Sequence, residues 1–311
     1  MSELELSTEV CPCSFHGTKS RLPQVQTISQ TVPPYIPKEI TDIIISLFPT
    51  DNPVNSYGPL CNCALVCRDW LPASRHHIFV NVWLRSDRQY NLFVSNVIRS
   101  PTVSFWLPST RRIVLFPLTH SYKTPTDDMK MHVASSLFMH QLGGKFPNLE
   151  QLQLINLDWG ISGRSISPRM FIVLSAFASV RTLSLKRVRF PSSGTMRCAI
   201  TALPSLNDLE MDGVTWPVSR SNRPLRDTRK SQFLRRLRRF RLGHLDFPLE
   251  EEMLGWLSVT SLGTSLVDLD IRSTALRNAS EIWELAGPSI TRLVTSFWPD
   301  RGEFPGDSTL H

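Results

Sequence analysis

The sequence predicts an α/β protein in which an N-terminal helical module precedes an irregular solenoid, built as a curved parallel sheet with return helices. Two observations lead to this prediction. Apolar residues recur at helical spacing in two short stretches near the N-terminus, and a strand-like apolar pattern then recurs every 26–31 residues. The chain has 311 residues, of which 41% are apolar and 20% charged, so it can form a small module and a larger domain with its own core.

Residues 1–32 carry scattered polar residues without apolar periodicity, which predicts a disordered leader. The N-terminus lacks an apolar secretory segment, and no apolar run approaches the roughly eighteen residues that span a bilayer. We therefore expect a cytoplasmic or nuclear protein with no membrane partner, whose six cysteines are thiols. The pairs Cys11–Cys13 and Cys61–Cys63 have one intervening residue each, too few for zinc ligands, so we expect no metal site and no cofactor.

Residues 33–82 are expected to form a helical module of two short amphipathic helices. The first helix carries Pro37 in its first turn, and its apolar residues fall at steps of three and four on one face: Ile40, Ile43, Ile44 and Leu47. A loop at 50–59 follows. The second helix ends near Pro72, and its apolar stripe comprises Leu60, Cys63, Val66, Cys67 and Trp70. Two helices this short cannot bury both stripes alone, so they must pack on the rest of the chain or on another protein.

The landmarks of this module resemble the F-box. The family pattern of Leu-Pro-x-Glu-Ile, an apolar helix and a closing Leu-Val-Cys-x-x-Trp is matched by Ile36-Pro37-x-Glu39-Ile40 and by Leu65-Val66-Cys67-x-x-Trp70. The run from Cys63 to Phe79 is especially similar to the large fungal set of F-box proteins. The departures are Ile36 in place of Leu and a long loop between the helices. An ordinary helical hairpin inside a core is the alternative.

The resemblance implies that the module docks the Skp-family adaptor of a cullin ubiquitin ligase, the SCF complex. The residues at matching positions are Ile36, Pro37, Ile40, Ile43, Ile44, Leu47, Leu60, Cys63, Val66 and Trp70.

A repeating apolar pattern occupies the larger domain, residues 83–311. Apolar residues stand at a start position and at +3, +5 and +8, followed by a large residue at +10, in copies that start at 149, 180, 206 and 237; a fifth at 266 lacks the +8 residue. Weaker copies begin near 110 and 290. We expect the +3 and +5 residues to point inward from a short strand and a helix to return the chain. The predicted strands include 79–84, and the predicted helices are 87–99, 169–178, 195–203, 249–262 and 280–286.

This pattern resembles the leucine-rich repeat, as in Leu149-x-x-Leu152-x-Leu154 and Leu206-x-x-Leu209-x-Met211. The family's Asn or Cys at +8 is replaced here by Leu, Val or Thr, so an irregular horseshoe is expected. A plain α/β domain is the alternative.

The +2 and +4 residues should project from the opposite, concave face, where acidic and basic strands alternate. The charged candidates for binding a target protein are Asp208, Glu210, Arg239, Arg241, Asp268 and Asp270. They could instead neutralise one another across the sheet.

No nucleotide-binding, metalloprotease or serine-hydrolase motif is present, so we predict a non-enzymatic protein. The resemblances together imply a target-recognition subunit of an SCF-type ligase, with an unknown protein target. Two alternatives stay open. One is an F-box-like scaffold outside any ligase, and the other is a nucleic-acid-binding repeat protein that uses the basic segment 220–241. That segment holds ten Lys or Arg against Asp227 but only two aromatics, so nucleic acid is the less favoured partner.

Overall fold

The computed structural model describes residues 36–48, 53–116, 138–160, 172–217, 236–245, 247–258, 265–273 and 287–297. The chain divides into two compact units, 1–37 and 38–311, and the second contains all of the described helices and strands. It is an α/β unit with one all-parallel sheet of eight strands. The predicted leader, the predicted helix 280–286 and positions 220–235 of the basic segment lie outside the described residues.

Three helices, rather than the two expected, form the N-terminal part of this unit: α1 (Lys38–Ser46), α2 (Pro53–Val66) and α3 (Trp70–Val80). Their small core consists of Ile45, Leu60 and Cys63. Phe48, Trp70, Ala73 and Ile78 pack against this core and are partly buried. None of the described helices is long and apolar enough to cross a membrane.

Two proline predictions in this region are wrong. The expected loop at 50–59 is helical from Pro53, because proline is tolerated at the first position of a helix, where its missing N–H has no intrahelical acceptor. Pro72 does not end a helix. It lies in the first turn of α3, where the same reasoning applies. The segment predicted as one helix from Leu60 to Trp70 is therefore the second half of α2, a break, and the start of α3.

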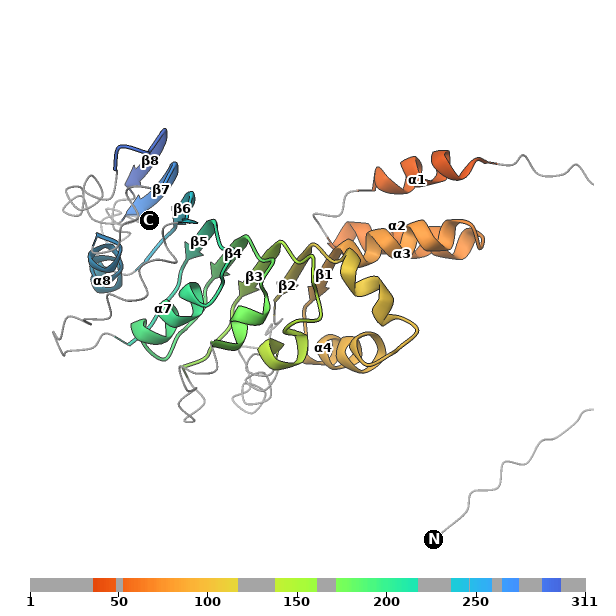
Figure 1. Ribbon diagram of the computed structural model, residues 1–311, viewed down its shortest axis with the longest axis horizontal. Coiled ribbons are helices and arrows are strands. Elements are labelled where there is room, and N and C mark those ends of the chain that lie inside the picture. The colour runs from red at the N-terminus through yellow and green to blue at the C-terminus, as the bar shows by residue number, and fades with distance from the viewer. Residues whose placement is uncertain are drawn as a thin grey trace, which may run out of the picture. The chain divides into compact units, whose positions relative to one another are not determined.

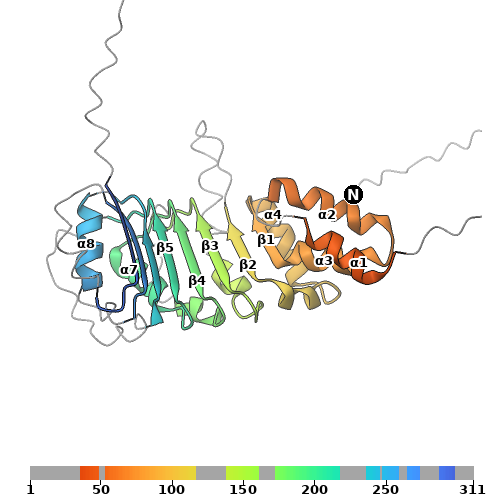
Figure 2. The same ribbon diagram turned by 90° about the horizontal axis from the view of Figure 1, so that it is seen from above.

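The sheet contains its strands in chain order, β1 to β8, and each strand pairs in parallel with the next (Figures 1 and 2). The strands are β1 (Asn81–Leu84), β2 (Arg112–Leu115), β3 (Gln151–Ile155), β4 (Thr182–Lys186), β5 (Asp208–Asp212), β6 (Arg239–Leu242), β7 (Asp268–Ser273) and β8 (Arg292–Phe297). Every apolar copy found in the sequence, including the two weak ones, corresponds to a strand.

Where the segments between strands are described, their helices differ from the predicted ones in bounds or type. The stretch 87–99 forms α4 (Asp87–Phe93) and a π-helical turn η1 (Val94–Ile98), and a 3-10 helix η2 (Ser104–Ser109) precedes β2. Of the predicted helix 169–178, residues 172–178 are described, and they contain the 3-10 helix η3 (Val173–Ala176). Among the described residues, return helices follow β4 and β6: α7 (Ser193–Thr201), which begins with a capping box of Ser192 and Thr195, and α8 (Phe247–Ser258).

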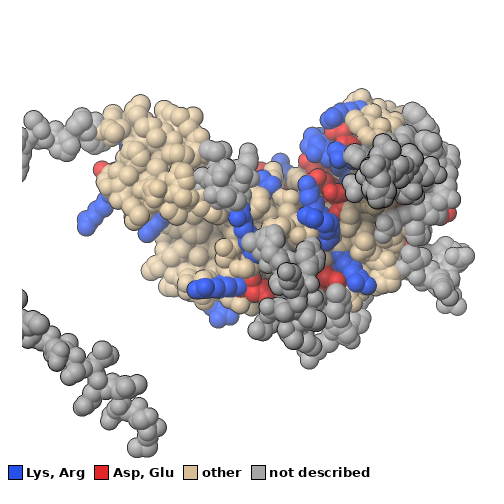
Figure 3. All heavy atoms as spheres, turned by 180° about the vertical axis from the view of Figure 1, so that it is seen from behind, with Lys and Arg blue, Asp and Glu red and all other residues tan. Residues whose placement is uncertain are grey.

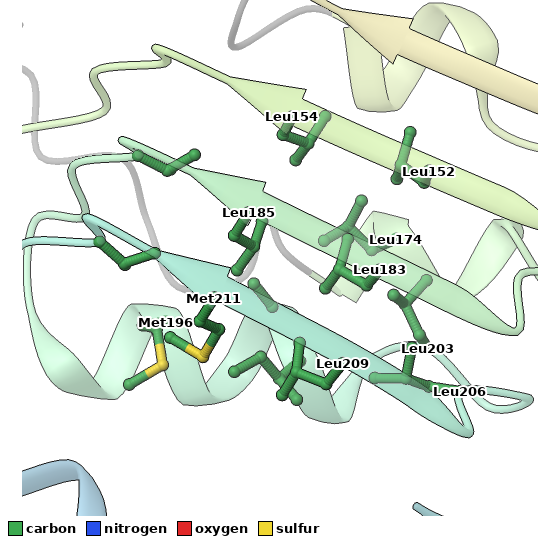
Figure 4. Close-up of a cluster of buried hydrophobic side chains, with 14 of the residues drawn as sticks. Leu152, Leu154, Leu174, Leu183, Leu185, Met196, Leu203, Leu206, Leu209 and Met211 are labelled. Atoms are coloured by element: carbon green, nitrogen blue, oxygen red, sulfur yellow. The ribbon is translucent and has the colours of Figure 1, made fainter. Parts of the chain in front are cut away.

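The main core lies between the sheet and these return segments. Figure 4 shows Leu152 and Leu154 of β3, Leu183 and Leu185 of β4, and Leu209 and Met211 of β5 on the same side of the sheet, with Leu174 of η3 and Met196 of α7. These strand residues are the +3 and +5 positions of the repeat, and each exposes 2% or less of its surface. The inward direction predicted for them is confirmed.

A left-handed turn follows three successive strands at the +7 position. Asn156, Arg187 and Gly213 have φ of 54°, 52° and 62°. Each of these residues donates its N–H to a carbonyl of the next repeat: Asn156 to Lys186 (2.8 Å), Arg187 to Asp212 (2.7 Å) and Gly213 to His244 (2.7 Å). The turn therefore continues the register of the sheet beyond the ends of the strands.

Candidate protein-binding surfaces

The apolar face predicted for the first helix exists, and it points away from the protein's own core. Its members Ile40, Ile43, Ile44 and Leu47 expose between 36% and 75% of their surface. Thr41 and Ile45 instead face inward, and Ile45 is fully buried. The sequence predicted which residues share a face; it did not predict that the next isoleucine in the run would fill the core.

The second predicted stripe divides into a buried and an exposed part. Leu60 and Cys63 lie in the core of the module, so they support its surface from inside and are not accessible to a partner. Val66 is exposed, and Trp70 is partly buried against the core. Leu65, which the helical stripe omitted, exposes 83% of its surface at the C-terminal end of α2. Its place in the Leu-Val-Cys landmark was the available signal.

Ile36 and Pro37 belong to the N-terminal unit, residues 1–37. Ile36 exposes 46% of its surface.

Tyr57 of α2 forms hydrogen bonds with the backbone of β1, the edge strand of the sheet. Its hydroxyl donates to the carbonyl oxygen of Asn81 (2.5 Å) and accepts from the N–H of Trp83 (3.2 Å), both on the edge strand β1. Burial raises the pKa of Tyr57 to about 12. The helical module is thereby bonded to the sheet, and two backbone groups of the edge strand are not free to pair with another chain. No sequence pattern predicted this contact, which spans 24 residues.

The +2 side chains of the last four strands form a continuous chain of ion pairs. Asp208 Oδ2 lies 3.2 Å from Arg239 Nη1, and Arg239 Nε lies 3.4 Å from Asp268 Oδ2. The same oxygen of Asp268 lies 3.4 Å from Arg292 Nη1. For Asp208, Arg239 and Asp268, the neutralisation across the sheet considered as an alternative is what the structure contains.

The +4 neighbours are arranged differently. Glu210 accepts from Ser184 Oγ (2.8 Å) and pairs with Lys186 Nζ (2.9 Å). Burial acts to raise the pKa of Glu210, but the hydrogen bonds from Lys186 and Ser184 and the charges of Lys186 and Arg241 outweigh it. The pKa of Glu210 therefore lies below its ordinary value, and the carboxylate is charged.

Arg241 and Arg272 form no ion pair in this network, although the charge of Arg241 acts on Glu210. Among the described residues, neither has an ion pair within 4.0 Å, and both are exposed on the polar face. Asp270, opposite Arg241 in the register, has an Oδ1 atom that is buried and has no hydrogen-bond partner. Figure 3 shows basic and acidic side chains beside one another on the molecule.

The described residues thus present exposed apolar side chains on α1 and at the end of α2, and a polar, charged face on the sheet. Within the same ranges no three His, Cys, Asp or Glu side chains gather as the ligands of a metal would. Cys61 is exposed and Cys63 buried, while Cys11 and Cys13 lie outside these ranges. No protein-family model matches the sequence, and no curated protein matches it significantly.

Proposed function

We propose that this chain is a non-catalytic, substrate-recognition subunit of an SCF-type ubiquitin ligase. The helical module docks a Skp-family adaptor, and the polar face of the sheet, which resembles that of leucine-rich-repeat proteins, holds a target protein. The observation that carries the proposal is the exposed apolar face of α1, which lies inside the segment that resembles the F-box.

This face is unusual for a protein surface. Single exposed aliphatic residues are common, but here three on one face of a nine-residue helix and Leu47 directly after it form a contiguous patch. Fully burying one such side chain contributes roughly 1.5–3 kcal/mol, so covering the exposed parts of four would contribute several kcal/mol to docking. Leu65 and Val66 add exposed apolar surface at the end of α2.

The residues divide into contacts and supports. Ile40, Ile43, Ile44, Leu47 and Val66 keep the contact role that the F-box resemblance gives them, and Leu65 joins them. Leu60 and Cys63 act from inside, by packing against Ile45 beneath the contact face. Trp70 packs at the edge of that core, and Ile36 and Pro37 retain their role from the family pattern alone.

The contribution of such a chain to ubiquitin transfer is proximity. An adaptor bound on the helical module brings the cullin arm and its E2 enzyme, and a target bound on the sheet is held at high effective concentration beside them. No covalent step on this chain is required.

Co-purification with a Skp adaptor tests the proposal. The full chain should bind stoichiometrically, and a variant carrying Ile43→Asp and Leu47→Asp should lose binding, because two charges would have to be buried at the contact. Leu92→Asp is the matched control, since Leu92 is an exposed leucine on α4 and 49% of its surface is accessible. Circular dichroism checks that every variant is folded. Absence of binding by the wild-type chain, or equal binding by both variants, contradicts the proposal.

A reconstituted ligase separates a receptor from a scaffold that binds the adaptor without supporting transfer. Nucleic-acid binding is less well supported by the described end of the basic segment. There Arg239 pairs with two aspartates and Arg236 donates to the Pro204 carbonyl (3.1 Å), so both guanidinium groups are already partly engaged within the protein.

A further inference from the structure

On the polar face of strands β5 to β8, some charged side chains form ion pairs or hydrogen bonds and others do not. This region carries four arginines and five carboxylates, which gives one net negative charge: Arg239, Arg241, Arg272 and Arg292 against Asp208, Glu210, Asp212, Asp268 and Asp270. An ideal surface for a polyanion would be strongly positive. The net charge therefore disfavours nucleic acid and densely phosphorylated ligands.

Most of the carboxylates nevertheless already have an ion pair or a hydrogen bond within the protein. Asp208 and Asp268 belong to the ion-pair chain, and Glu210 is held by Ser184 and Lys186. Asp212 accepts from the N–H of His244 (3.1 Å) and lies so close to Gly243 that a Cβ there would collide with it. For Asp270, the Oδ1 atom is buried, where a ligand does not reach it.

Two guanidinium groups remain available, and they are neighbours. Arg241 of β6 stands opposite Asp270 of β7, and Arg272 follows two residues further along β7, on the same face. Strand spacing and rise put their Cα atoms about 8 Å apart, within reach of one small anionic group between two long side chains. Within the described residues neither has an ion-pair partner at 4.0 Å or less.

We propose that Arg241 and Arg272 together bind the side-chain carboxylate of an Asp or Glu in an extended, unphosphorylated segment of the target protein. A single negative charge satisfies the two arginines, whereas a phosphate dianion would meet additional repulsion from Glu210, Asp212 and Asp270. The inference rests on the proposed role of this face in target binding.

The position of the pair within the face favours a side chain over a chain terminus. Strands with uncharged polar residues lie on one side of it, with Gln151 and Gln153 on β3 and Thr182 on β4, and β8 lies on the other. A bound segment that crosses the strands can therefore continue in both directions. The exposed amide of Gln151 can bond to its backbone, whereas Gln153 already accepts from Arg112 and the Thr182 hydroxyl already donates to Asp208.

Peptide selection tests this inference on the full chain. Random twelve-residue peptides displayed on phage, with their C-termini fused to the coat protein, are selected against the wild-type chain and counter-selected against Arg241→Ala. Selected peptides should carry Asp or Glu at a fixed position. Each is then synthesised with Glu, Gln or phosphoserine at that position, and Kd is measured by fluorescence polarisation.

We expect Glu→Gln in the peptide to weaken binding at least about tenfold, the strength of one charge-assisted hydrogen bond. Arg241→Ala should cause a similar loss with the Glu peptide and almost none with the Gln peptide, since the two changes remove the same contact. Arg241→Lys should restore part of the affinity, because lysine keeps the charge but not the planar fork. Arg238→Ala, an exposed arginine three residues earlier, should leave Kd unchanged.

Three results would overturn the inference: a selection without acidic peptides, a phosphoserine peptide that binds tenfold more tightly than its Glu counterpart, or an equal loss in Arg238→Ala. These results are independent of adaptor docking. A chain that selects acidic peptides through Arg241 but does not bind a Skp adaptor would refute the proposed ligase function and leave this site intact. Adaptor binding without selection of acidic peptides would refute the arginine site and leave the proposed ligase function intact.

Discussion

Arg187 has a left-handed backbone conformation that is less favourable for arginine than for the residues at the equivalent positions of the adjacent repeats. At φ 52° it shares the left-handed region with Asn156 and Gly213, but only glycine and asparagine adopt that region readily. The turn is imposed by the register of the sheet, since the Arg187 N–H must reach the Asp212 carbonyl. The side chain in turn packs over Gly213, where an added Cβ would lie 3.1 Å from Arg187 Cγ.

Replacing Arg187 by Asn should therefore stabilise the protein by about 1 kcal/mol, the order of the strain that the left-handed region costs an ordinary side chain. Urea unfolding followed by circular dichroism measures this change. Arg181→Asn, an exposed arginine at an ordinary φ in the same repeat, should change the free energy of unfolding by less than about 0.5 kcal/mol. A destabilised Arg187→Asn variant would mean that packing over Gly213 outweighs the strain.

Tyr57 makes stability sensitive to alkaline pH. Burial raises the pKa of Tyr57 and of Tyr90 to about 12, whereas both ionise near 10 in the unfolded chain. The raised values mean that the folded protein retains these protons when the unfolded chain has lost them. The contribution is complete below pH 10 and is lost as pH rises through 12. Stability should thus fall across this window, and less steeply in Tyr57→Phe.

Urea midpoints at pH 9, 10.5 and 11.5 give the slopes. Tyr90→Phe serves as the comparison, because it removes the other tyrosine, whose hydroxyl donates to Gln141 (2.6 Å) and not to the sheet edge. Equal slopes in Tyr57→Phe and the wild type would contradict the assignment. At neutral pH, Tyr57→Phe should cost about 1–3 kcal/mol, since the Asn81 carbonyl and Trp83 N–H lose their partner.

At the scale of elements, a polar cluster joins α7 to α8. Glu252 of α8 accepts from Trp216 Nε1 (2.8 Å) and pairs with Arg197 of α7 (3.5 Å), whose guanidinium lies 5.4 Å from the centre of the Trp256 ring. Burial lowers the pKa of Arg197, and the charge of Glu252 opposes that change. The two helices are therefore connected by charged side chains that are only partly buried.

Glu252→Ala should destabilise the protein by about 2–3 kcal/mol, because it leaves the half-buried Arg197 and the Trp216 N–H without their acceptor. Glu251→Ala is the matched control. Glu251 is adjacent to Glu252 in the sequence but is exposed, so its replacement should have little effect on stability. Thermal unfolding of the three proteins provides the comparison. A similar loss of stability in both variants would mean that helix propensity, not the cluster, determines the result.

The sequence predicted strands better than helices, for a physical reason. A strand of the repeat is defined by two inward residues two positions apart, such as Leu209 and Met211. This local pattern is present in every copy except the last, where Thr295 of β8 is exposed. Helix boundaries depended on the local role of proline: Pro53 and Pro72 were interpreted as loop and stop signals, although each lies where a helix can begin. Of the predicted helix at 169–178, residues 169–171 lie outside the described part of the chain, and the remainder contains the 3-10 helix η3.

The candidate surfaces were predictable to the same extent. Alternation along strands placed Arg239 and Arg241 on one face, and that prediction is confirmed by the exposure of both beside buried Phe240 and Leu242. Which charges would pair depended on side-chain geometry across strands, which no local pattern contains. Arg272 was omitted from the predicted target-binding residues for this reason, and Tyr57 because its partners are distant in sequence.

At the scale of the whole unit, the sheet begins inside what the sequence suggested as the helical module. Strand β1 follows α3 without an intervening residue, and α2 covers two groups of its free edge through Tyr57. An unprotected edge strand pairs readily with other chains. The helices are therefore expected to protect the sheet from association as well as to present the docking face.

Deleting residues 1–80 should consequently yield a chain that associates through β1, even though all eight strands remain. Static light scattering after purification should show species larger than a monomer for 81–311 at concentrations where 36–311 shows none. Introducing Trp83→Pro into the shortened chain should reduce this association, because proline removes the N–H that Tyr57 normally satisfies and that another strand would otherwise use. A monomeric 81–311 chain would show that the edge needs no cover and that Tyr57 serves only to hold the helices.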